Sequence, residues 1–160
     1  MSVIKIPAAK FEEAEILKSV SMHAFKENYE KYGHYPPGIE SLDWHKEKIK
    51  NGIYRTIQYE KSIVGGVYMN FHPNNEMEIE YLFITPKYQG QKIGAAVMDL
   101  IEKEYKKITK WFLYTPYKDY RNHYFYEKFG YEKVGEVQPI EKDEFTLFKY
   151  EKTLNTQPGA

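Results

Sequence analysis

The sequence predicts a mixed α+β fold, in which a mostly antiparallel sheet of about seven strands is flanked by about four helices. Short alternating or apolar runs, typical of strands, occur between and after helical patterns along the chain. One helical pattern follows a strand through a glycine-bearing turn. The 160 residues suffice for one core and are few for two. We therefore expect a single domain over residues 1–152.

The first fifty residues indicate a short strand and two helices. Weak alternation over residues 2–6 is typical of the strand. A long amphipathic helix begins at Phe11, and the two prolines and two glycines of residues 32–38 must end it. Ser41 or Asp43 caps a shorter second helix. The apolar side of the long helix consists of Phe11, Ala14, Leu17 and Phe25.

The middle of the chain reads as an antiparallel meander. Residues 53–72 form two strands that turn near residues 59–62, and a third strand runs from Glu76 to Thr85. Gly65 and Gly66 interrupt the second strand. They indicate either a bulge or the close approach of another chain segment.

The last third of the chain alternates between helices and strands. The expected order is a helix from Ile93, a strand over residues 111–115, a helix over 120–129, and a closing pair of strands over 131–137 and 145–150. Residues 153–160 have nothing to bury, so we expect a disordered tail there.

Composition limits the classes of partner. The 23 basic and 23 acidic side chains cancel, so no overall field attracts a polyanion such as nucleic acid. Cysteine is absent, which excludes disulfides, a thiolate nucleophile and cysteine zinc sites, and fits a reducing cytoplasm. No apolar run approaches the ~20 residues needed to cross a bilayer, so we expect a cytoplasmic protein without a membrane partner. The five histidines lack metal-ligand spacing, and we expect no metal.

The segment that carries most information runs from Tyr81 to Ala96. An apolar strand stops at Pro86, and a turn containing Gly90 then opens a helix near Gly94. Glycine leaves no Cβ in the way, so backbone N–H groups at the helix start can close on a phosphate that the helix dipole also favours. The sequence therefore predicts a phosphorylated cofactor, although an ordinary strand, turn and helix would have the same pattern.

The spacing excludes two common phosphate loops. Neither G-x-G-x-x-G nor G-x-x-x-x-G-K-[ST] can be written from Gly90 to Ala96. The segment resembles the pyrophosphate loop of the GCN5-related N-acetyltransferases, [QR]-x-x-G-x-[GA] after a strand L-x-V-x-P. Leu82, Ile84 and Pro86 match that strand, whereas Gln89 and Gly94 match the loop and Lys92 stands at its middle glycine.

A second segment resembles the late motif of the same family. Residues 120–131 match a helix ending F-Y-E-K-x-G-[FY], and Phe125 and Phe129 form an apolar i, i+4 pair before Gly130. Asp119 stands where the family often has an asparagine, and Asn122 is displaced from that position. The resemblance covers roughly residues 53–152.

The resemblance implies acetyl-coenzyme A as cofactor, and a GNAT-like sheet whose fourth and fifth strands part in a V-shaped splay. The pantetheine arm would pair with the backbone of the fourth strand at the splay, like an added strand. The implied cofactor-binding residues are Leu82, Phe83, Ile84, Gln89, Gly90, Gln91, Lys92, Ile93, Gly94, Ala95, Asn122 and Tyr126.

Acetyl transfer to an amine needs a base and an acid. A lysine-like amine has a pKa of ~10.4, so a base or a water chain must take its proton at neutral pH. Glu78 and Glu80 point to the same side of their strand and are the candidate bases, and solvent-facing carboxylates are the alternative. The resemblance gives Tyr126 the role of general acid toward the leaving sulfur. The alternative is that Tyr126 packs its ring and bonds a backbone carbonyl.

The sequence does not identify the acceptor amine. The family builds its acceptor site near residues 29–44, where Tyr29, Tyr32, His34 and Tyr35 would bind a cation of a small molecule or peptide, unless they form a solvated loop. The predicted function is acetyl-coenzyme A-dependent N-acetylation by direct attack in a ternary complex. A catalytically silent coenzyme A-binding module is the alternative. The sequence leaves the oligomeric state open, and a homodimer is compatible with it.

Overall fold

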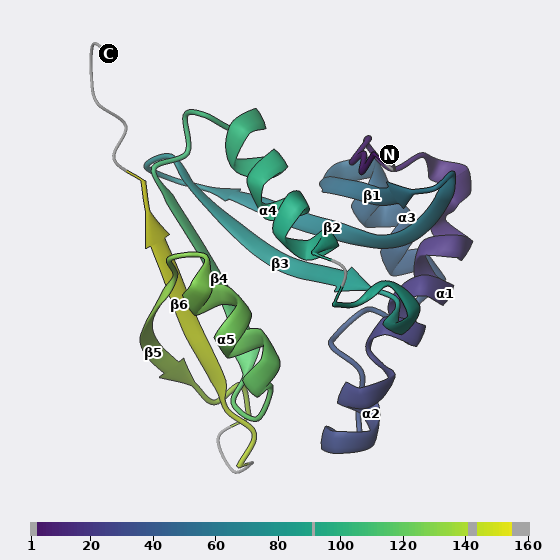
Figure 1. Cartoon of the computed structure of the whole chain (residues 1–160). Helices are drawn as coiled ribbons and strands as arrows, with labels where there is room; N and C mark the ends of the chain where they lie inside the picture. Colours follow the sequence, from purple (N-terminus) through teal and green to yellow (C-terminus); the bar gives the residue numbers. More distant parts are fainter. Residues whose placement is uncertain (1–2, 91, 141–143, 155–160) are drawn as a thin grey trace. The chain divides into compact units, whose positions relative to one another are not determined.

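The computed structural model describes residues 3–90, 92–140 and 144–154. Six strands form one sheet in the order β1-β2-β3-β4-β6-β5 (Figure 1). The strands are β1 (Ile53–Tyr59), β2 (Ser62–His72), β3 (Glu76–Ile84), β4 (Lys110–Pro116), β5 (Glu132–Val137) and β6 (Leu147–Thr153). The helices are α1 (Ala14–Ala24), α2 (Lys26–Tyr32), α3 (Leu42–Asn51), α4 (Ile93–Glu104) and α5 (Tyr120–Lys128), with 3-10 turns η1 (Phe11–Glu13) and η2 (Pro86–Tyr88).

The chain divides into two compact units that interleave along the sequence. The first unit comprises Met1–Met69 and Tyr81–Glu104, and the second comprises Asn70–Glu80 and Tyr105–Ala160. Strands β2 and β3 therefore each contribute residues to both units. A single domain over residues 1–152 stays a prediction.

The first unit has helices on both faces of its strands. Tyr54 and Tyr68 are paired across β1 and β2, and their rings form a buried cluster with Leu17 of α1, against which Trp44 of α3 packs. Neighbouring side chains in a strand point to opposite faces. Arg55 accordingly reaches the other face, where its guanidinium donates a 2.6 Å hydrogen bond to Glu104 at the end of α4. In Figure 1, α4 lies in front of β2 and α3 behind it.

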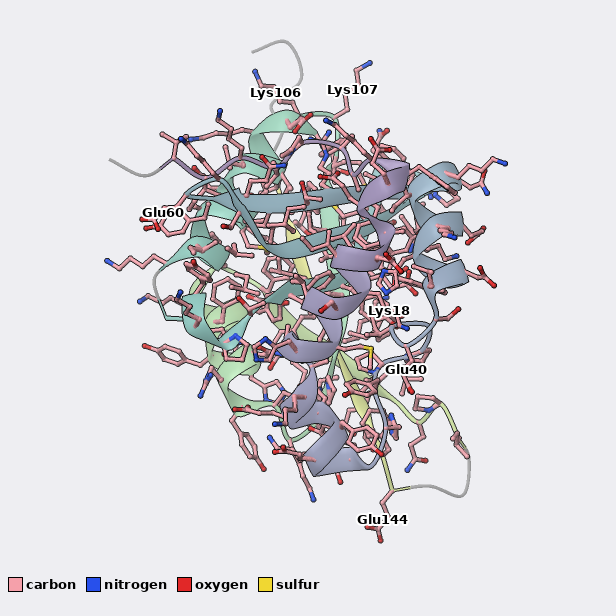
Figure 2. The ribbon with its side chains drawn as sticks, turned by 90° about the vertical axis from the view of Figure 1, so that its right-hand side faces the viewer. Lys18, Glu40, Glu60, Lys106, Lys107 and Glu144 are labelled. Carbon is pink, nitrogen blue, oxygen red and sulfur yellow. The ribbon has the colours of Figure 1, made fainter. Side chains whose placement is uncertain are left out.

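The hairpin of β1 and β2 is closed by a two-residue turn. Tyr59 pairs with Ser62, and both Glu60 (φ 50°) and Lys61 (φ 66°) adopt left-handed backbone. Two consecutive residues with positive φ define the turn whose twist matches that of the flanking strands. Figure 2 shows Glu60 at the outer end of this turn, with its side chain directed away from the ribbon.

The Gly65–Gly66 pair was predicted to mark either a bulge or the close approach of another chain segment, and the structure has both. The register of β1 and β2 shifts between Ile57 and Gln58, whose partners are Gly65 and Ile63, so Val64 is the extra residue of a bulge. A Cβ on Gly65 would lie 2.0 Å from the carbonyl oxygen of Phe83. The bulge and the missing side chains therefore allow β3 to lie close against β2.

The predicted first strand is wrong, which lowers the strand count from about seven to six. Within the described residues, the N-terminal segment forms two isolated bridges, Lys5–Gln58 and Ala8–Arg55. Pro7 lies between them and has no N–H to donate, although its carbonyl accepts from Thr56. The segment therefore cannot form a continuous ladder with β1.

The predicted long first helix is divided, so the described residues contain five α-helices instead of about four. Phe25 (φ −95°, ψ 14°) separates α1 from α2. Phe11 belongs to the 3-10 turn η1 and is 56% exposed, contrary to its predicted place on the apolar side of the helix. Ala14 and Leu17 are buried as predicted, because they lie within the regular turns of α1.

The second unit places α5 on one face of its strands. Leu113 of β4 pairs with Tyr150 of β6, and the ring of Tyr126 in α5 lies 6.5 Å from that of Tyr150. Figure 1 shows α5 alongside β4 and β6. Strand β6 ends at Thr153, and residues 155–160 of the expected tail lie outside the described residues.

The parallel pairing of β3 with β4 is short. It runs from the pair Glu76–Lys110 to the pair Ile79–Leu113. Both strands extend further, β3 to Ile84 and β4 to Pro116. The predicted parting of these two strands agrees with a ladder that ends before the strands do.

Candidate active site

The predicted phosphate loop lies between β3 and α4 in the first unit. The side-chain amide of Gln89 donates a 2.8 Å hydrogen bond to the carbonyl of Ile84, which ties the loop to the end of the strand. Gly90 has φ 78° and Lys92 has φ 63°, so the chain takes two left-handed steps before the helix. Gln91, a predicted cofactor ligand, lies outside the described residues.

The first turn of α4 offers an anion backbone donors that its own helix leaves unpaired. The N–H of Ala96 donates to the carbonyl of Lys92, which is the first backbone hydrogen bond at this end of the helix among the described residues. The N–H groups of Ile93, Gly94 and Ala95 precede it and have no partner within the helix. The Ile93 side chain is buried and fixes the turn. The helix dipole adds to the attraction, so this turn has the chemistry of a phosphate site.

Lys92 has a side chain where the family usually has glycine, but its backbone conformation is the one that the family motif requires. Its φ of 63° lies in the region that favours glycine, the residue usual at this position of the family. Its side chain is exposed. The loop thus has the shape expected of the motif, at the cost of a strained non-glycine residue.

The end of β3 was predicted to pair with the pantetheine arm. Phe83 is buried and packs with Leu17, Tyr54 and Tyr68, whereas Leu82 and Ile84 are partly exposed. The Ile84 carbonyl accepts from Gln89, and the N–H of Thr85 donates to Val64. The buried Phe83 ring therefore fixes this strand end, and the role of its amides toward a cofactor stays a prediction.

Tyr126 lies in the second unit, on the buried side of α5. Its ring centroid is 5.8 Å from that of Tyr131. Burial raises the pKa of the Tyr126 phenol above its ordinary value, and the nearby charge of Asp119 adds to this. None of the hydrogen bonds among the described residues uses its hydroxyl. The phenol therefore keeps its proton and is available as a donor.

The end of α5 has the form predicted from the motif. The rings of Phe125 and Phe129 lie 5.4 Å apart, and Gly130 has a left-handed φ of 96°. The N–H of Tyr131 donates to the carbonyl of Tyr126. Asn122 donates a long 3.4 Å hydrogen bond to the hydroxyl of Thr115 on β4. Its predicted contact with the cofactor stays a prediction.

The two candidate bases differ in their partners. Glu78 accepts a 3.0 Å hydrogen bond from the imidazole of His72, and Glu80 accepts one of 3.0 Å from the side-chain amide of Asn70. The Glu78 side chain is 18% exposed, and Glu80 is an exposed residue. Each carboxylate is thus held by a side chain of β2, but only Glu78 has a partner that can carry a proton.

Tyr126 and Glu78 belong to opposite faces of the sheet in the second unit. Glu78 pairs with Phe112 across β3 and β4, whereas the neighbouring residue Leu113 pairs with Tyr150 on the face that α5 covers. The candidate acid and the candidate base are therefore separated by the thickness of the strands. The contact between His72 and Glu78 was not predicted, because it depends on strand pairing, for which the sequence has no direct signal.

The predicted acceptor residues form two aromatic pairs in the first unit. The rings of Tyr29 and Tyr35 lie 4.9 Å apart, and those of Tyr32 and His34 lie 6.4 Å apart. Tyr29 is 48% exposed, and the Lys31 ammonium lies 5.9 Å from the Tyr32 ring. The four residues thus form two separate ring pairs on α2 and the segment after it.

Two further observations concern the described part of the chain. It contains no group of three or more histidine, aspartate or glutamate side chains suited to a metal ion. None of its helices combines the length and the apolarity that a membrane span requires.

Comparison with known proteins agrees with this fold. Residues 17–131 match the model of the acetyltransferase (GNAT) family. The PaiA N-acetyltransferase of Thermoplasma acidophilum, solved with coenzyme A, superposes with a TM-score of 0.78 at 22% identity, over 94% of this chain and 99% of that one. An acetyltransferase of Thermus thermophilus gives 0.79 at 14% identity, over 95% and 97%.

A curated relative is similar in sequence over a shorter stretch. The uncharacterized protein YrkN of Bacillus subtilis (strain 168) is 30% identical over 74 residues, which are 46% of this chain and 40% of that protein. The chain thus matches less than half the length of this relative.

The chain belongs to the acetyltransferase (GNAT) family, because the family model matches most of its length. The resemblance inferred from the two sequence motifs is confirmed, as is the predicted α+β fold class.

Proposed function

We propose that this chain transfers an acetyl group from acetyl-coenzyme A to a primary amine of a small molecule or peptide, by direct attack in a ternary complex. The observation that carries the proposal is the left-handed loop at Gly90 and Lys92 before the open first turn of α4. The family match and the coenzyme A in the PaiA complex support the same donor. The absence of cysteine fits both direct attack and a reducing cytoplasm.

The donor would be held by backbone groups. Amides from Gln89 to Ala95 would bind the diphosphate, and the strand end from Leu82 to Ile84 would pair with the pantetheine arm. Asn122 of α5 is proposed to contact the same arm. The backbone interactions use main-chain atoms that side-chain substitutions leave in place, so conformation at the loop matters more than residue type.

The proton that the leaving sulfur needs is assigned to Tyr126. A coenzyme A thiolate resembles a free thiol of pKa ~8.5, which is below that of a phenol, so the transfer needs assistance from the site. Burial keeps the Tyr126 phenol protonated. A strand amide at Leu82 or Phe83 is the proposed donor to the thioester carbonyl.

The acceptor is proposed to be a cation before it reacts. The exposed Tyr29 ring and its neighbour Tyr35 offer aromatic faces that attract ammonium groups. Tyr32 and His34 form a second aromatic pair in the same stretch of chain. Aromatic rings attract the ammonium group of a small amine and that of a peptide alike. The proposal therefore includes both kinds of acceptor.

The test is release of the coenzyme A thiol from acetyl-coenzyme A in the presence of an amine panel. The panel covers polyamines, amino acids, aminoglycosides and peptides with a free N-terminus or lysine. We expect release that depends on one class of amine. Calorimetric binding of acetyl-coenzyme A without release for any class would contradict catalysis and favour a coenzyme A-binding module.

A further inference from the structure

One imidazole in the second unit is held in the arrangement of a general base. His72 is the last residue of β2, and its Nε2 lies 3.0 Å from Oε1 of Glu78 in β3. The His72 side chain is 40% exposed and that of Glu78 is 18% exposed. The imidazole is therefore the more accessible member of the pair, and the carboxylate supports it from the inner side.

The ring of His72 is also fixed from a second direction. Its centroid lies 4.8 Å from that of Phe112, at 70°, which is an edge-to-face contact. Phe112 is buried in β4. The turn after His72 is tight, with φ of 68° at Asn74 and 59° at Asn75. The contact with Phe112 thus supports the same ring orientation as the contact with Glu78.

The hydrogen bond to Glu78 decides which nitrogen can take a proton. An ionised carboxylate only accepts hydrogen bonds, so Nε2 of His72 carries the hydrogen and Nδ1 carries the lone pair. Within the described part of the chain, the hydrogen bonds of this ring use Nε2 alone. The neighbouring carboxylate of Glu80 is held by the amide of Asn70, which has no basic nitrogen.

We propose that His72, oriented by Glu78, takes the proton of the acceptor ammonium. This inference rests on the proposed acetyl transfer, and it replaces a carboxylate base with an imidazole base whose tautomer a carboxylate fixes. Glu78 is then a positioning residue, which also stabilises the positive charge that the ring acquires.

The proton balance closes without a further reactant. An N–H bond of the ammonium breaks, its electron pair stays on the amine nitrogen, and the proton forms a bond to Nδ1 of His72. The neutral amine attacks the thioester carbon, and the C–S bond breaks. Two protons remain on the amine nitrogen. One stays in the amide. The other is released, and its loss equals the one proton that the leaving sulfur takes up. The imidazolium returns its proton to water.

Other charged groups around Phe112 come from β4 and β6 and are paired with one another. The ammonium of Lys149 lies 4.9 Å from the centre of the Phe112 ring and 3.3 Å from the Glu151 carboxylate. Lys110 lies 3.8 Å from the same carboxylate. Glu78 is thus the charge in direct contact with His72, and the pH dependence of the reaction should respond to both members of this pair.

The experiment compares three conservative variants with the wild type. His72→Gln keeps a donor toward Glu78 but cannot take a proton, Glu78→Gln keeps an acceptor but loses the charge, and His23→Gln makes the same change as the first on the exposed side of α1. The measurement is kcat/KM from pH 6 to 10 with the best amine of the panel. Thermal unfolding and acetyl-coenzyme A binding check that each variant is folded, and His72→Asn serves as a second variant.

We expect His72→Gln to lower kcat/KM about 100-fold at pH 7, in the range of general-base contributions. The defect should shrink as the pH approaches the pKa of the amine, which then loses its proton unaided. Glu78→Gln should cause a smaller loss, and His23→Gln should retain the wild-type profile.

Two results would overturn the role of His72. One is an unchanged pH profile in His72→Gln, and the other is a large loss in Glu78→Gln alone, which would make Glu78 the base. Failure of the proposed function has a different signature, because the wild type itself would then release no thiol with any amine. That result would remove the inference together with its premise.

Discussion

At the scale of single residues, burial decides what Tyr126 can do. Its ring contacts Tyr131 and Tyr150 in the core of the second unit, yet its hydroxyl makes none of the hydrogen bonds found among the described residues. A buried phenol has a raised pKa and stays protonated over the neutral range. The side chain therefore has a fixed position and keeps its proton, but the raised pKa makes the phenol a weaker acid, so proton transfer to the leaving sulfur would depend on assistance from the rest of the site.

Replacing Tyr126 with Phe tests that role. The variant keeps the ring and its packing but removes the proton, so we expect kcat to fall about 100-fold while the affinity for acetyl-coenzyme A changes little. Steady-state kinetics and calorimetry measure the two quantities. Tyr120→Phe, an exposed tyrosine on the same helix, is the matched control. Unchanged turnover in Tyr126→Phe across pH 6 to 9 would reject the acid role.

Two glycines that lie in strands differ in what surrounds them. A Cβ on Gly65 in β2 would meet the Phe83 carbonyl oxygen at 2.0 Å, whereas a Cβ on Gly135 in β5 has nothing within 4 Å. Overpacking against backbone costs about 1–3 kcal/mol, because neither strand can move freely. We expect Gly65→Ala to lower the free energy of unfolding by about this amount, and Gly135→Ala to change it by less than about 0.5 kcal/mol. Urea titration measures both, and equal effects would contradict the close approach of β3.

At the scale of elements, the loop before α4 has the left-handed backbone expected of the family motif, but it has a lysine where the family usually has glycine. Lys92 adopts φ 63°, a conformation that costs a residue with a side chain about 1–2 kcal/mol relative to right-handed backbone. The strain persists because η2 and the buried Ile93 fix the chain on both sides of the loop. Local strain at a binding loop is common where function over-determines the backbone.

Substitutions at Lys92 separate its backbone conformation from its charge. Lys92→Gly and Lys92→Ala both remove the ammonium, but only glycine adopts positive φ without cost. We expect the glycine variant to be more stable than the alanine variant by about 1 kcal/mol in urea unfolding. If the ammonium lies near phosphate, both variants should bind acetyl-coenzyme A more weakly than the wild type, with stronger salt dependence in the wild type. Equal stabilities of the two variants would contradict the left-handed conformation.

At the scale of the whole molecule, the sequence predicts features that depend on neighbouring residues, such as helix ends. It does not predict contacts that depend on which strands pair. Ser41 caps α3 through a 3.1 Å bond from the Trp44 amide, and Gly130 ends α5, because both signals act within a few residues. Periodicity correctly predicted that Ala14 and Leu17 lie on the apolar side of α1, but it also placed Phe11 there, and Phe11 is exposed. His72 meets Glu78 only through the strand pairing of β2 and β3, which is a property of the fold.

The buried His45 links the stability of the molecule to pH. It is 0% exposed, its Nε2 donates to the carbonyl of Ile39, and its Nδ1 accepts from the hydroxyl of Tyr54. Burial lowers the pKa of His45 below its ordinary value, the hydrogen bond to Ile39 opposes this, and the charge of Lys18 adds to the lowering. Figure 2 labels Lys18 on α1. The neutral ring has both nitrogens satisfied, whereas a charged ring would direct a second N–H at Tyr54.

Stability should therefore fall as the pH drops below the range of a free histidine. With a lowered pKa in the folded state, the unfolded chain binds more protons below pH ~6.5, so the contribution of His45 is complete above that value and is lost progressively below it. The slope that one such group adds approaches about 1.4 kcal/mol per pH unit. Urea unfolding at intervals from pH 7.5 to 5 measures it, with His45→Gln expected to flatten the curve and His23→Gln, an exposed histidine, to leave it unchanged. A wild-type curve as flat as that of His45→Gln would show that His45 titrates alike in the folded and unfolded chain.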